Sequence, residues 1–564
     1  MFVGLDMGGT HTDAVLVSPQ DGVLRYVKKP TRHDFLASIE EALEELLDGI
    51  HTSGIDRVNL STTVCTNAIV EGKTEPVGLI IVPGPGLNPS FLQCGQLNFI
   101  IQGSIDHRGR ETSPLNEQEL NWVKQQLRAT GLRSLAVVGK FSTRNPTHEL
   151  RIARFLEGDY DFVTLGHRLS GRLGFPRRVY TAYLNSAVWR VFSRFADAVQ
   201  AYLAKKGLVT EPFILKADGG TLALSVAKNV PVETILSGPA ASIMGALALL
   251  PTEEDAVILD IGGTTTDISF CMEGLPLLEP QGIKIGPHLT LVRSLLAYSV
   301  GLGGDSCIQV KEGQLYIGPE RLGPPACLGG PAPTPTDALV VLGLLHLGNA
   351  ELSRKALKSV ANSLNLSIDS AAEAVLSEFT KRIAQVVGDL VHQLNQKPVY
   401  TLREILMGRK LQPAKAIVVG TPARFFKPFL SKALGISVEV PELAGVANAI
   451  GAALSRPTAS LTVFADTQQR RVLIPEIGWE ESIPAHFTVE KAKVLAFQFL
   501  RRRLKEIGYT EPEPELEVIE EQVFNVVRGF NTVGKNIRLK VQNKPLPMSL
   551  VGSLTTDLKG PSPV

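Results

Sequence analysis

The sequence has few cysteines and no long hydrophobic run. Its 564 residues contain five cysteines, an odd number, and none of them forms a Cys-x-x-Cys pair. This spacing provides neither a disulfide framework nor a typical zinc site. No apolar stretch reaches the ~18 residues that a membrane-spanning helix needs, and the chain opens without a charged segment before an apolar run. We therefore expect a cytoplasmic protein with reduced thiols and no membrane partner.

The chain also lacks an excess of either charge. Lys and Arg number 57 and Asp and Glu 56, which gives a formal net charge of +1 at pH 7. A near-neutral chain has no overall field that would attract it to nucleic acid. The sequence is instead rich in glycine, with 51 residues, and has 36 prolines. Because 44% of the residues are hydrophobic, this composition indicates tight turns and sites lined by backbone rather than disorder.

Short, wholly apolar runs alternate with helical patterns along most of the chain. Residues 79–82, 135–138, 256–259 and 416–419 are such runs, which are typical of strands covered by helices on both faces. Helical spacing of apolar residues also predicts a helix over 34–49. The sequence therefore predicts an α/β fold.

The pattern changes after residue 456. Residues 461–464 and 471–474 resemble strands, 487–507 have a helical pattern, and 515–541 are mixed. We interpret residues 457–564 as a separate C-terminal α+β domain of unknown role, with frayed residues at 559–564. Two larger regions, 1–180 and 181–456, precede it.

A short motif occurs twice at a domain-sized offset. Leu5-Asp6-Met7-Gly8-Gly9-Thr10-His11-Thr12-Asp13 is matched by Leu259-Asp260-Ile261-Gly262-Gly263-Thr264-Thr265-Thr266-Asp267, and each copy joins two apolar runs. Glycine lets the backbone approach a phosphate closely, and N–H groups and Thr hydroxyls bind its oxygens. The repeat predicts two related half-domains that each offer a hairpin to one phosphate-binding cleft.

The hairpins supply the first set of candidate residues. Asp6 and Asp260 can hold Mg²⁺ or another divalent metal, or orient a nucleophilic water. Asp13 and Asp267 either join this metal site or cap their own hairpins. We predict contacts with nucleotide phosphates from the turns of both hairpins: Gly8, Gly9, Thr10, Thr12, Gly262, Gly263 and Thr264. No Gly-x-x-x-x-Gly-Lys-Ser/Thr phosphate loop occurs in the chain.

The paired hairpins resemble those of the actin-like ATPase superfamily, which shares a ribonuclease H-like fold and includes sugar kinases, actin and heat-shock ATPases. The resemblance implies duplicated ATPase domains that bind ATP and Mg²⁺ between them. It also implies a glycine turn after a late strand that holds the adenosine. Val418-Val419-Gly420-Thr421-Pro422-Ala423 stands at that place, with Thr421 where the superfamily commonly has a second glycine.

Several other segments resemble one branch of this superfamily, the hydantoinase/oxoprolinase family, and especially its A-type subunits. They follow the family's order as far as about residue 455: Ser61–Ala68, Asn145–Glu149, Arg178–Asn185, Asp218–Gly220, Leu236–Ala240, Gly301–Ser306 and the Gly/Pro-rich stretch 318–338. Two positions depart from the family pattern. His11 stands where the family has Phe, and Asp305 where it has a third glycine.

The resemblance implies an ATP-dependent hydrolase. Phosphoryl transfer to the carbonyl oxygen of a cyclic amide, such as a hydantoin, 5-oxoproline or another lactam, makes the carbon electrophilic, and water then opens the ring. It also implies an A-type subunit that works with a hydantoinase B-type subunit in a homo- or hetero-oligomer. The alternatives are an ATP-dependent ketone carboxylase subunit, a small-molecule kinase, and a non-catalytic ATPase that acts as a reactivating, chaperone-like factor.

The matched segments add further candidates. His148 and Glu149 either bind a metal and relay protons or only begin a helix, where Glu149 would favour the helix dipole. Gly303 and Gly304 are expected to line the nucleotide side of the cleft, as is Gly420.

Four polar residues are substrate candidates. Thr63 and Asn67 either point into the cleft or cap a helix, and Arg178 and Asn185 either contact substrate or have surface and capping roles.

Overall fold

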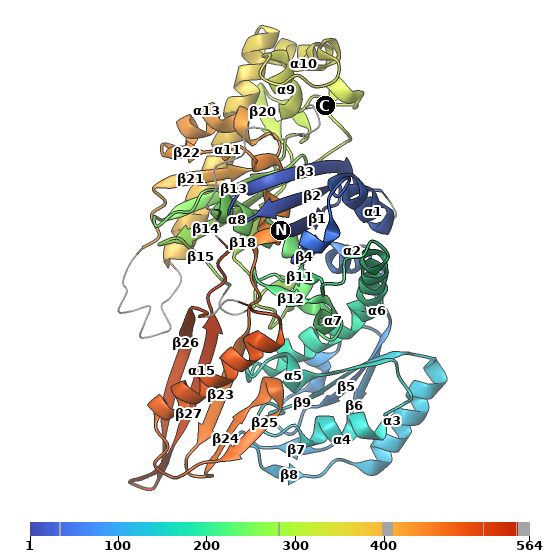
Figure 1. The fold of residues 1–564 in the computed structure, drawn as a ribbon, viewed down its shortest axis with the longest axis vertical. Helices are drawn as coiled ribbons and strands as arrows, with labels where there is room; N and C mark the ends of the chain where they lie inside the picture. The colour runs from blue at the N-terminus through green and yellow to red at the C-terminus, as the bar shows by residue number, and fades with distance from the viewer. Residues whose placement is uncertain (33–34, 280–281, 397–409, 511–512, 549, 551–564) are drawn as a thin grey trace.

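The computed structural model describes residues 1–32, 35–279, 282–396, 410–510, 513–548 and 550. Two α/β halves lie next to each other in the upper part of the molecule, and two further sheets lie side by side below them (Figure 1). Within the described residues, no helix combines the length and apolar character that crossing a bilayer requires.

The first half contains a six-stranded sheet in the order β12-β11-β4-β1-β2-β3. β1 pairs antiparallel with β2 and parallel with β4. Side chains alternate between the faces of β2, so Leu16 packs with helix α1 and Val15 packs with helix α14. The elements of this half are β1 (Phe2–Met7), β2 (His11–Ser18), β3 (Gly22–Pro30), α1 (Phe35–Leu46), β4 (Arg57–Thr62), α2 (Val64–Val70), β11 (Phe213–Leu215), β12 (Thr221–Ala223) and α7 (Leu224–Ala227).

The predicted helix over 34–49 is confirmed as α1, although residue 34 itself lies outside the described residues. The four apolar runs predicted as strands are also confirmed, within β5, β9, β13 and β21.

The second half repeats the plan of the first. Its sheet runs β15-β14-β13-β21-β22, and β18 adds to β14. β13 pairs antiparallel with β14 and parallel with β21, as β1 does with β2 and β4. Its elements are α8 (Ser237–Leu249), β13 (Ala256–Ile261), β14 (Thr266–Met272), β15 (Leu275–Pro276), β16 (Lys284–Ile285), β17 (His288–Leu289), β18 (Ala297–Val300), β19 (Ile308–Lys311), β20 (Gln314–Ile317), α9 (Pro335–Val341), α10 (Ala350–Leu364), α11 (Ile368–Gln396), β21 (Lys415–Val419), α13 (Ala423–Leu434), β22 (Ser437–Glu439) and α14 (Ala447–Leu454).

Helices α8 and α14 cross between the two sheets, and glycines permit their close contact. A Cβ atom on Gly245 of α8 would lie 1.9 Å from the carbonyl oxygen of Ala447, and one on Gly451 of α14 would lie 2.1 Å from that of Ala241. Gly4 of β1 is packed as tightly against Ala449. Since no larger residue fits at these positions, the crossing fixes how the two halves face one another.

A third unit is inserted between α2 and β11. Its four-stranded parallel sheet has the order β10-β9-β5-β6. The predicted boundary between residues 180 and 181 falls inside its long helix α6, which also packs on the first half. The elements are β5 (Val77–Val82), β6 (Leu97–Ile100), β7 (Ser104–Ile105), β8 (Glu111–Ser113), α3 (Glu117–Thr130), β9 (Ser134–Gly139), α4 (Thr147–Phe155), β10 (Phe162–Leu165), α5 (Gly166–Leu169) and α6 (Phe175–Lys205).

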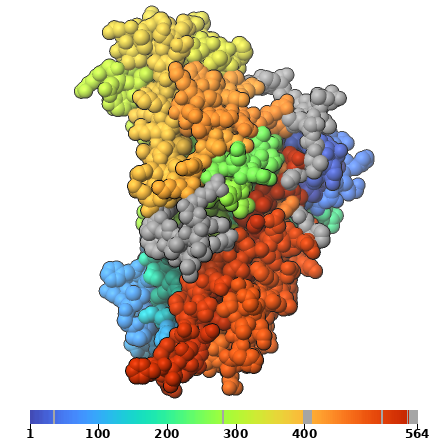
Figure 2. All heavy atoms as spheres, turned by 90° about the vertical axis from the view of Figure 1, so that its left-hand side faces the viewer, coloured from blue at the N-terminus to red at the C-terminus, as the bar shows by residue number. Residues whose placement is uncertain are grey.

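The C-terminal region forms an antiparallel sheet, β25-β24-β23-β27-β26, with helix α15 packed on it. Its surface runs in orange and red along the lower part of the molecule in Figure 2. The predicted strands and helix are present, and 515–541 forms two long strands. Residues 559–564 lie outside the described residues. The elements are β23 (Ser460–Asp466), β24 (Arg471–Ile474), β25 (Trp479–Ser482), α15 (Val489–Glu506), β26 (Leu516–Arg528) and β27 (Asn531–Asn543).

Candidate active site

The two copies of the sequence motif form two hairpins with the same geometry. In β1 and β2, Asp6 stands directly opposite Asp13, and in β13 and β14, Asp260 stands directly opposite Asp267. The turns close with equivalent hydrogen bonds, from Gly8 N to the carbonyl of His11 (3.0 Å) and from Gly262 N to that of Thr265 (2.9 Å). The sequence repeat is therefore a structural repeat.

The helices between the sheets bring the hairpin carboxylates together. Asn448 of α14 lies beside both Asp6 and Asp260 and lowers the pKa of each, and Ser242 of α8 donates to Asp260. Lys28 of β3 donates to both oxygens of Asp13, at 2.8 and 2.7 Å. Lys28, Ser242 and Asn448 carry no recognisable motif. Only the tertiary structure shows that they face the hairpins.

This cleft holds more negative charge than its neighbouring cations neutralise. Burial, with the repulsion of Asp13, raises the pKa of Asp6 to about 7. Burial, with the repulsion of Asp260, raises the pKa of Asp267 to about 6. The pKa values of Asp13 and Asp260 are also raised, first by burial. Carboxylates that are buried without matching positive charge are typical of sites that bind a cation or move protons.

The turns of the two hairpins differ in their surroundings. A Cβ atom on Gly9 would have nothing within 4 Å, so this turn is open, whereas one on Gly263 would lie 2.7 Å from Asp305 Oδ2. Arg321 donates to the same carboxylate oxygen (3.0 Å) and to Thr264 Oγ1 (3.3 Å). The second hairpin thus has a guanidinium at its tip, which the sequence pattern did not reveal.

The glycines outside the hairpins support the second one from two sides. Gly304 N donates to the carbonyl of Gly262 (2.9 Å) and Gly303 N to the hydroxyl of Ser306 (2.8 Å). The first bond holds the loop against the hairpin, and the second closes the loop on itself. Gly420, with a φ of +101°, follows β21, where a Cβ atom would lie 2.3 Å from the carbonyl of Ile261. The predicted adenosine turn thus reaches the base of the second hairpin.

Four predicted residues lie in or near the first hairpin. Thr12 is fully buried, and its hydroxyl bonds to that of Thr31 (3.1 Å) rather than facing the cleft. Thr63 donates to the carbonyl of Met7 (3.4 Å), and Asn67 donates to the Thr63 hydroxyl (3.2 Å). Thr10 is exposed at the turn itself.

His148 and Glu149 do not join the hairpin carboxylates. They begin α4, and Glu149 accepts hydrogen bonds from Gly139 N (2.8 Å) and from the backbone and ring of His167. His148 bonds to Glu111. Burial alone would raise the pKa of Glu149. The hydrogen bond and the charge of His167 nevertheless hold this pKa below its ordinary value.

Two predicted substrate contacts are buried in the same inserted unit. Arg178 donates to the carbonyls of Gly139 (2.9 Å) and Arg172 (2.8 Å). Asn185 donates to the hydroxyl of Thr164 and the carbonyl of Asn229, both at 3.1 Å. Both side chains are fully buried, so the structure uses them to hold helix α6 in place.

A cavity of about 450 Å³ opens beside the second hairpin. Asp267 and Ser299 line one side, Leu236 and Pro239 at the start of α8 line another, and Lys284 contributes a charge. This volume lies within the usual range for small-molecule sites, roughly 300–1,000 Å³. A ligand here would sit next to the hairpin carboxylates.

The two α/β halves have matching topology, and each carries an Asp-bearing hairpin close enough to the other for Asp260 to raise the pKa of Asp13. This arrangement is an actin-like ATPase fold. The chain belongs to the hydantoinase/oxoprolinase family. The family's sequence model matches residues 178–460, and that of the hydantoinase/oxoprolinase N-terminal region matches residues 2–159.

Among curated proteins, the chain is similar to the caprolactamase subunit alpha of Pseudomonas jessenii, with 27% identity over 425 residues, 66% of this chain and 60% of the relative. It is similar to the acetophenone carboxylase gamma subunit of Aromatoleum aromaticum, with 26% identity over 460 residues, 70% of this chain and 62% of the relative. The 5-oxoprolinase 1 of Arabidopsis thaliana is 26% identical over 60% of this chain and 31% of its own length. The chain thus spans about 60% of the length of the first two relatives.

Solved structures share the whole fold. The ATP-dependent caprolactamase from Pseudomonas jessenii superposes with a TM-score of 0.75 at 21% identity and covers 99% of this chain and 90% of its own. A nucleotide-free acetone carboxylase superposes with a TM-score of 0.68 at 17% identity and covers 97% of this chain and 88% of its own.

Proposed function

We propose that this chain is the ATP- and Mg²⁺-dependent component of an enzyme that activates the carbonyl group of a small cyclic amide by phosphoryl transfer. The convergence of the two hairpins, with Asn448 beside both Asp6 and Asp260 and with Asp260 close enough to raise the pKa of Asp13, carries this proposal. Membership of the hydantoinase/oxoprolinase family supports the reaction class.

In this proposal the hairpin turns hold the nucleotide phosphates. Backbone N–H groups of the open Gly8-Gly9-Thr10 turn face one side, and the Gly262-Gly263-Thr264 turn with Arg321 faces the other. The glycine turn at Gly420 lies against the adenosine. Donors that are fixed in place before the reaction stabilise the charge that develops during transfer.

The carboxylates suit Mg²⁺ bound together with phosphates. In the described part of the chain, no three His, Cys, Asp or Glu side chains are grouped closely enough to hold a metal ion by themselves. Mg²⁺ at a nucleotide commonly uses one or two carboxylates, with phosphate oxygens and waters completing the shell. Asp6 and Asp260 would supply these ligands, and the ion would offset the charge on the phosphates. Asp13, tied to Lys28, and Asp267 would flank them.

The substrate would occupy the cavity beside Asp267, with its carbonyl oxygen towards the terminal phosphate. That oxygen attacks the γ-phosphorus and the bond to ADP breaks. A first water then adds to the activated carbon, and the ring C–N bond breaks to leave an acyl phosphate. A second water hydrolyses this acyl phosphate to the carboxylate and inorganic phosphate. The nitrogen takes up a proton as the ring opens. The protein's task is to position the two reactants and exclude competing water.

A partner subunit is part of the proposal. The relatives named above include an alpha subunit and a gamma subunit of larger enzymes. We propose that this chain works with a B-type subunit and, with it, forms a hetero-oligomer.

A second candidate is the ATP-dependent carboxylation of a ketone. It is favoured by the match to the acetophenone carboxylase gamma subunit, which covers 70% of this chain. The same cleft would then hold a ketone activated as its enol phosphate, whose α-carbon would attack carbon dioxide supplied by bicarbonate. The phosphoryl group would leave as inorganic phosphate with the oxygen that bicarbonate releases. Bicarbonate dependence separates the two candidates.

The test measures phosphate release from Mg-ATP by the purified chain, with and without its partner subunit. Hydantoin, 5-oxoproline, caprolactam and acetophenone are added in turn, with and without bicarbonate. The proposal requires release that depends on a cyclic amide and is lost in Asp6→Asn but kept in Asp389→Asn, a change of an exposed carboxylate on α11. A ketone- and bicarbonate-dependent release would establish the second candidate, and full turnover by Asp6→Asn would refute both.

A further inference from the structure

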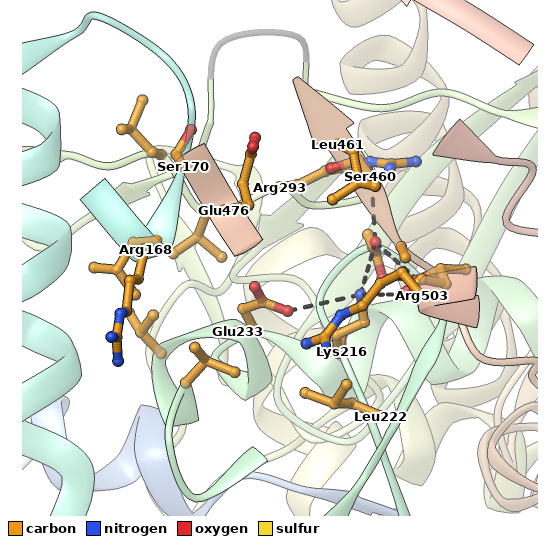
Figure 3. Close-up of a pocket in the computed structure, with 18 of the residues that line it drawn as sticks. Arg168, Ser170, Lys216, Leu222, Glu233, Arg293, Ser460, Leu461, Glu476 and Arg503 are labelled. Carbon is orange, nitrogen blue, oxygen red and sulfur yellow. Dashed lines mark hydrogen bonds and ion pairs between the residues drawn. The ribbon is translucent and has the colours of Figure 1, made fainter. Parts of the chain in front are cut away.

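A second cavity, of about 160 Å³, lies where the C-terminal sheet meets the rest of the molecule (Figure 3). Lys216 and Asp218 line it from the β11–β12 turn, and Arg293 lines it from the segment before β18. Glu476 and Lys540 come from the C-terminal region. None of the hairpin carboxylates lines this space, so it is distinct from the ATP cleft.

One group of charged side chains in this cavity has all its hydrogen-bond and ion-pair partners within the chain. Lys216 donates to Asp218 (3.2 Å) and to the carbonyl of Thr458 (3.1 Å), and it pairs with Glu233 at 3.6 Å, as the dashed line in Figure 3 shows. Asp218 also accepts from the Thr458 hydroxyl and from Gly220 N. These bonds tie the β11–β12 turn to the C-terminal region and need no further partner.

Two cations that line the same cavity have fewer partners. Arg293 approaches Asp218 only at 3.9 Å through Nε, and its Nη2 is buried without a hydrogen-bond partner. Lys540 forms no ion pair or hydrogen bond through its amine within the described part of the chain. Burial and the repulsion of Arg172 and Arg293 lower the pKa of Lys540 to about 7. Both cations are half-buried, and the nearby carboxylates, among them Asp218 for Arg293 and Glu476 for Lys540, offset their charge only in part. Because such an incompletely balanced cation is unfavourable, an anion placed between the two would stabilise both.

The rest of the lining combines apolar side chains with a few polar ones, including the guanidinium groups of Arg168 and Arg503. Leu222, Val232, Leu291, Leu461 and Ile477 surround the charged groups. A cavity of roughly 150 Å³ holds a molecule the size of benzene, so the space suits a ligand with a short aliphatic body rather than a bare inorganic ion.

We propose that this cavity binds a small aliphatic carboxylate, whose anionic group lies between Arg293 and Lys540 and whose chain lies on the apolar lining. A guanidinium forms paired hydrogen bonds with a carboxylate. The C-terminal region then has a role, because without Lys540 and Glu476 the site would be open on one side. This binding does not depend on the proposed function, since it requires no ATP.

The test uses the full chain without nucleotide and follows thermal unfolding and calorimetric titration at constant ionic strength. Pentanoate is the probe, pentanamide is its neutral counterpart, and inorganic phosphate is an anion without an aliphatic body. We expect saturable binding and a raised Tm with pentanoate alone. Equal effects of pentanamide, an effect of phosphate alone, or no pentanoate binding would overturn the proposal.

Two variants and one control complete the experiment. Arg293→Gln and Lys540→Met should each weaken pentanoate binding at least tenfold, whereas Lys535→Met, at an exposed position on the same strand as Lys540, should not. Lys540→Met should also raise the Tm of the free protein, because it removes an unpaired cation. A structural role for Lys540 predicts a lower Tm instead. If Arg293→Gln fails to fold, Lys540→Met decides the matter, and unchanged pentanoate binding by it would refute the site.

Discussion

Two of the places where the molecule buries carboxylates differ in how the buried charge is balanced. In the hairpin cleft, four aspartates face one another with Lys28 as a neighbouring cation, and the pKa values of all four are raised. In the inserted unit, Glu149 accepts bonds from two backbone N–H groups and from His167, and its pKa is lowered.

The difference separates a site that needs a ligand from one that completes the fold. Glu149 has every partner it requires within the chain, so its charge stabilises the packing of α4, α5 and β9. The hairpin aspartates lack enough partners, so their charge is balanced only when something else binds. A buried carboxylate alone therefore does not indicate a functional site, whereas a buried carboxylate whose charge is not balanced within the chain does.

The largest expected effect is on activity. Asp260→Asn should lower ATP turnover by a factor on the order of 10²–10³, the usual loss when one transition-state contact is removed. Its stability should be unchanged or higher, because the change relieves repulsion with Asp13 and Asp267. Steady-state phosphate release and thermal unfolding measure the two quantities. If the variant loses both ATP turnover and thermal stability, Asp260 has a structural role like that of Glu149.

Glu149→Gln should have the opposite profile. Removing one partner of a buried charge network costs about 3 kcal/mol of unfolding free energy, whereas ATP turnover per folded molecule should be unchanged. Urea unfolding and active-site-normalised turnover measure these effects.

The effect of Glu149 also has a pH dependence. Because the pKa of Glu149 is lowered in the fold, its stabilisation is present above its unfolded pKa of roughly 4.3 and is lost as the pH falls towards the folded value. The stability difference between wild type and Glu149→Gln should therefore narrow on acidification. A constant difference down to pH 3 would show that the charge of Glu149 is not what stabilises the unit.

Arg321, at the tip of the second hairpin, tests whether a charged residue there binds ATP or only stabilises the fold. Arg321→Gln should raise the KM for ATP about tenfold, the value of one charge-assisted hydrogen bond of about 1.4 kcal/mol, with little change in stability. Asp305→Asn is the matched variant. If Arg321 contacts phosphate, Asp305→Asn releases it from its ion pair and leaves ATP binding as tight or tighter. If the pair is only structural, both variants should weaken ATP binding alike.

The smallest expected effect concerns the open turn. Gly9→Ala adds a methyl group where nothing lies within 4 Å, so stability should change by less than about 0.5 kcal/mol. ATP binding should weaken, because the methyl group occupies the space of a phosphate. Titration with a nucleotide detects this loss. Gly49→Ala would be a poor control, since its φ of +72° makes any side chain strained, whereas Gly388→Ala in α11 is also free of neighbours.

The sequence predicted the parts of this site that depend on local structure. A strand, a glycine turn and a second strand need only neighbouring residues, so the two hairpins, their opposed aspartates and the α/β class could be expected from the pattern. The buried strands around Ile80, Val137 and Val418 were predicted for the same reason, because an apolar run is itself the signal.

Residues whose role depends on distant contacts could not be predicted in this way. Lys28, Ser242, Asn448 and Arg321 are single polar residues in otherwise ordinary segments, and each gains its role only where another element packs against it. The converse holds for Glu149 and Arg178. Their segments match a family pattern, yet both side chains bond to Gly139 in the inserted unit. Glu149 accepts a hydrogen bond from the Gly139 N–H, and Arg178 donates one to the Gly139 carbonyl.

The sequence by itself thus determined that two matching hairpins exist, and family membership follows from the order of its segments. Only the tertiary structure decided that they meet, because the meeting depends on the close crossing of α8 and α14, where Gly245 and Gly451 leave room for backbone contact. It also decided which buried charges are balanced. Charge balance is a property of distances between groups remote in sequence, and no local pattern encodes it.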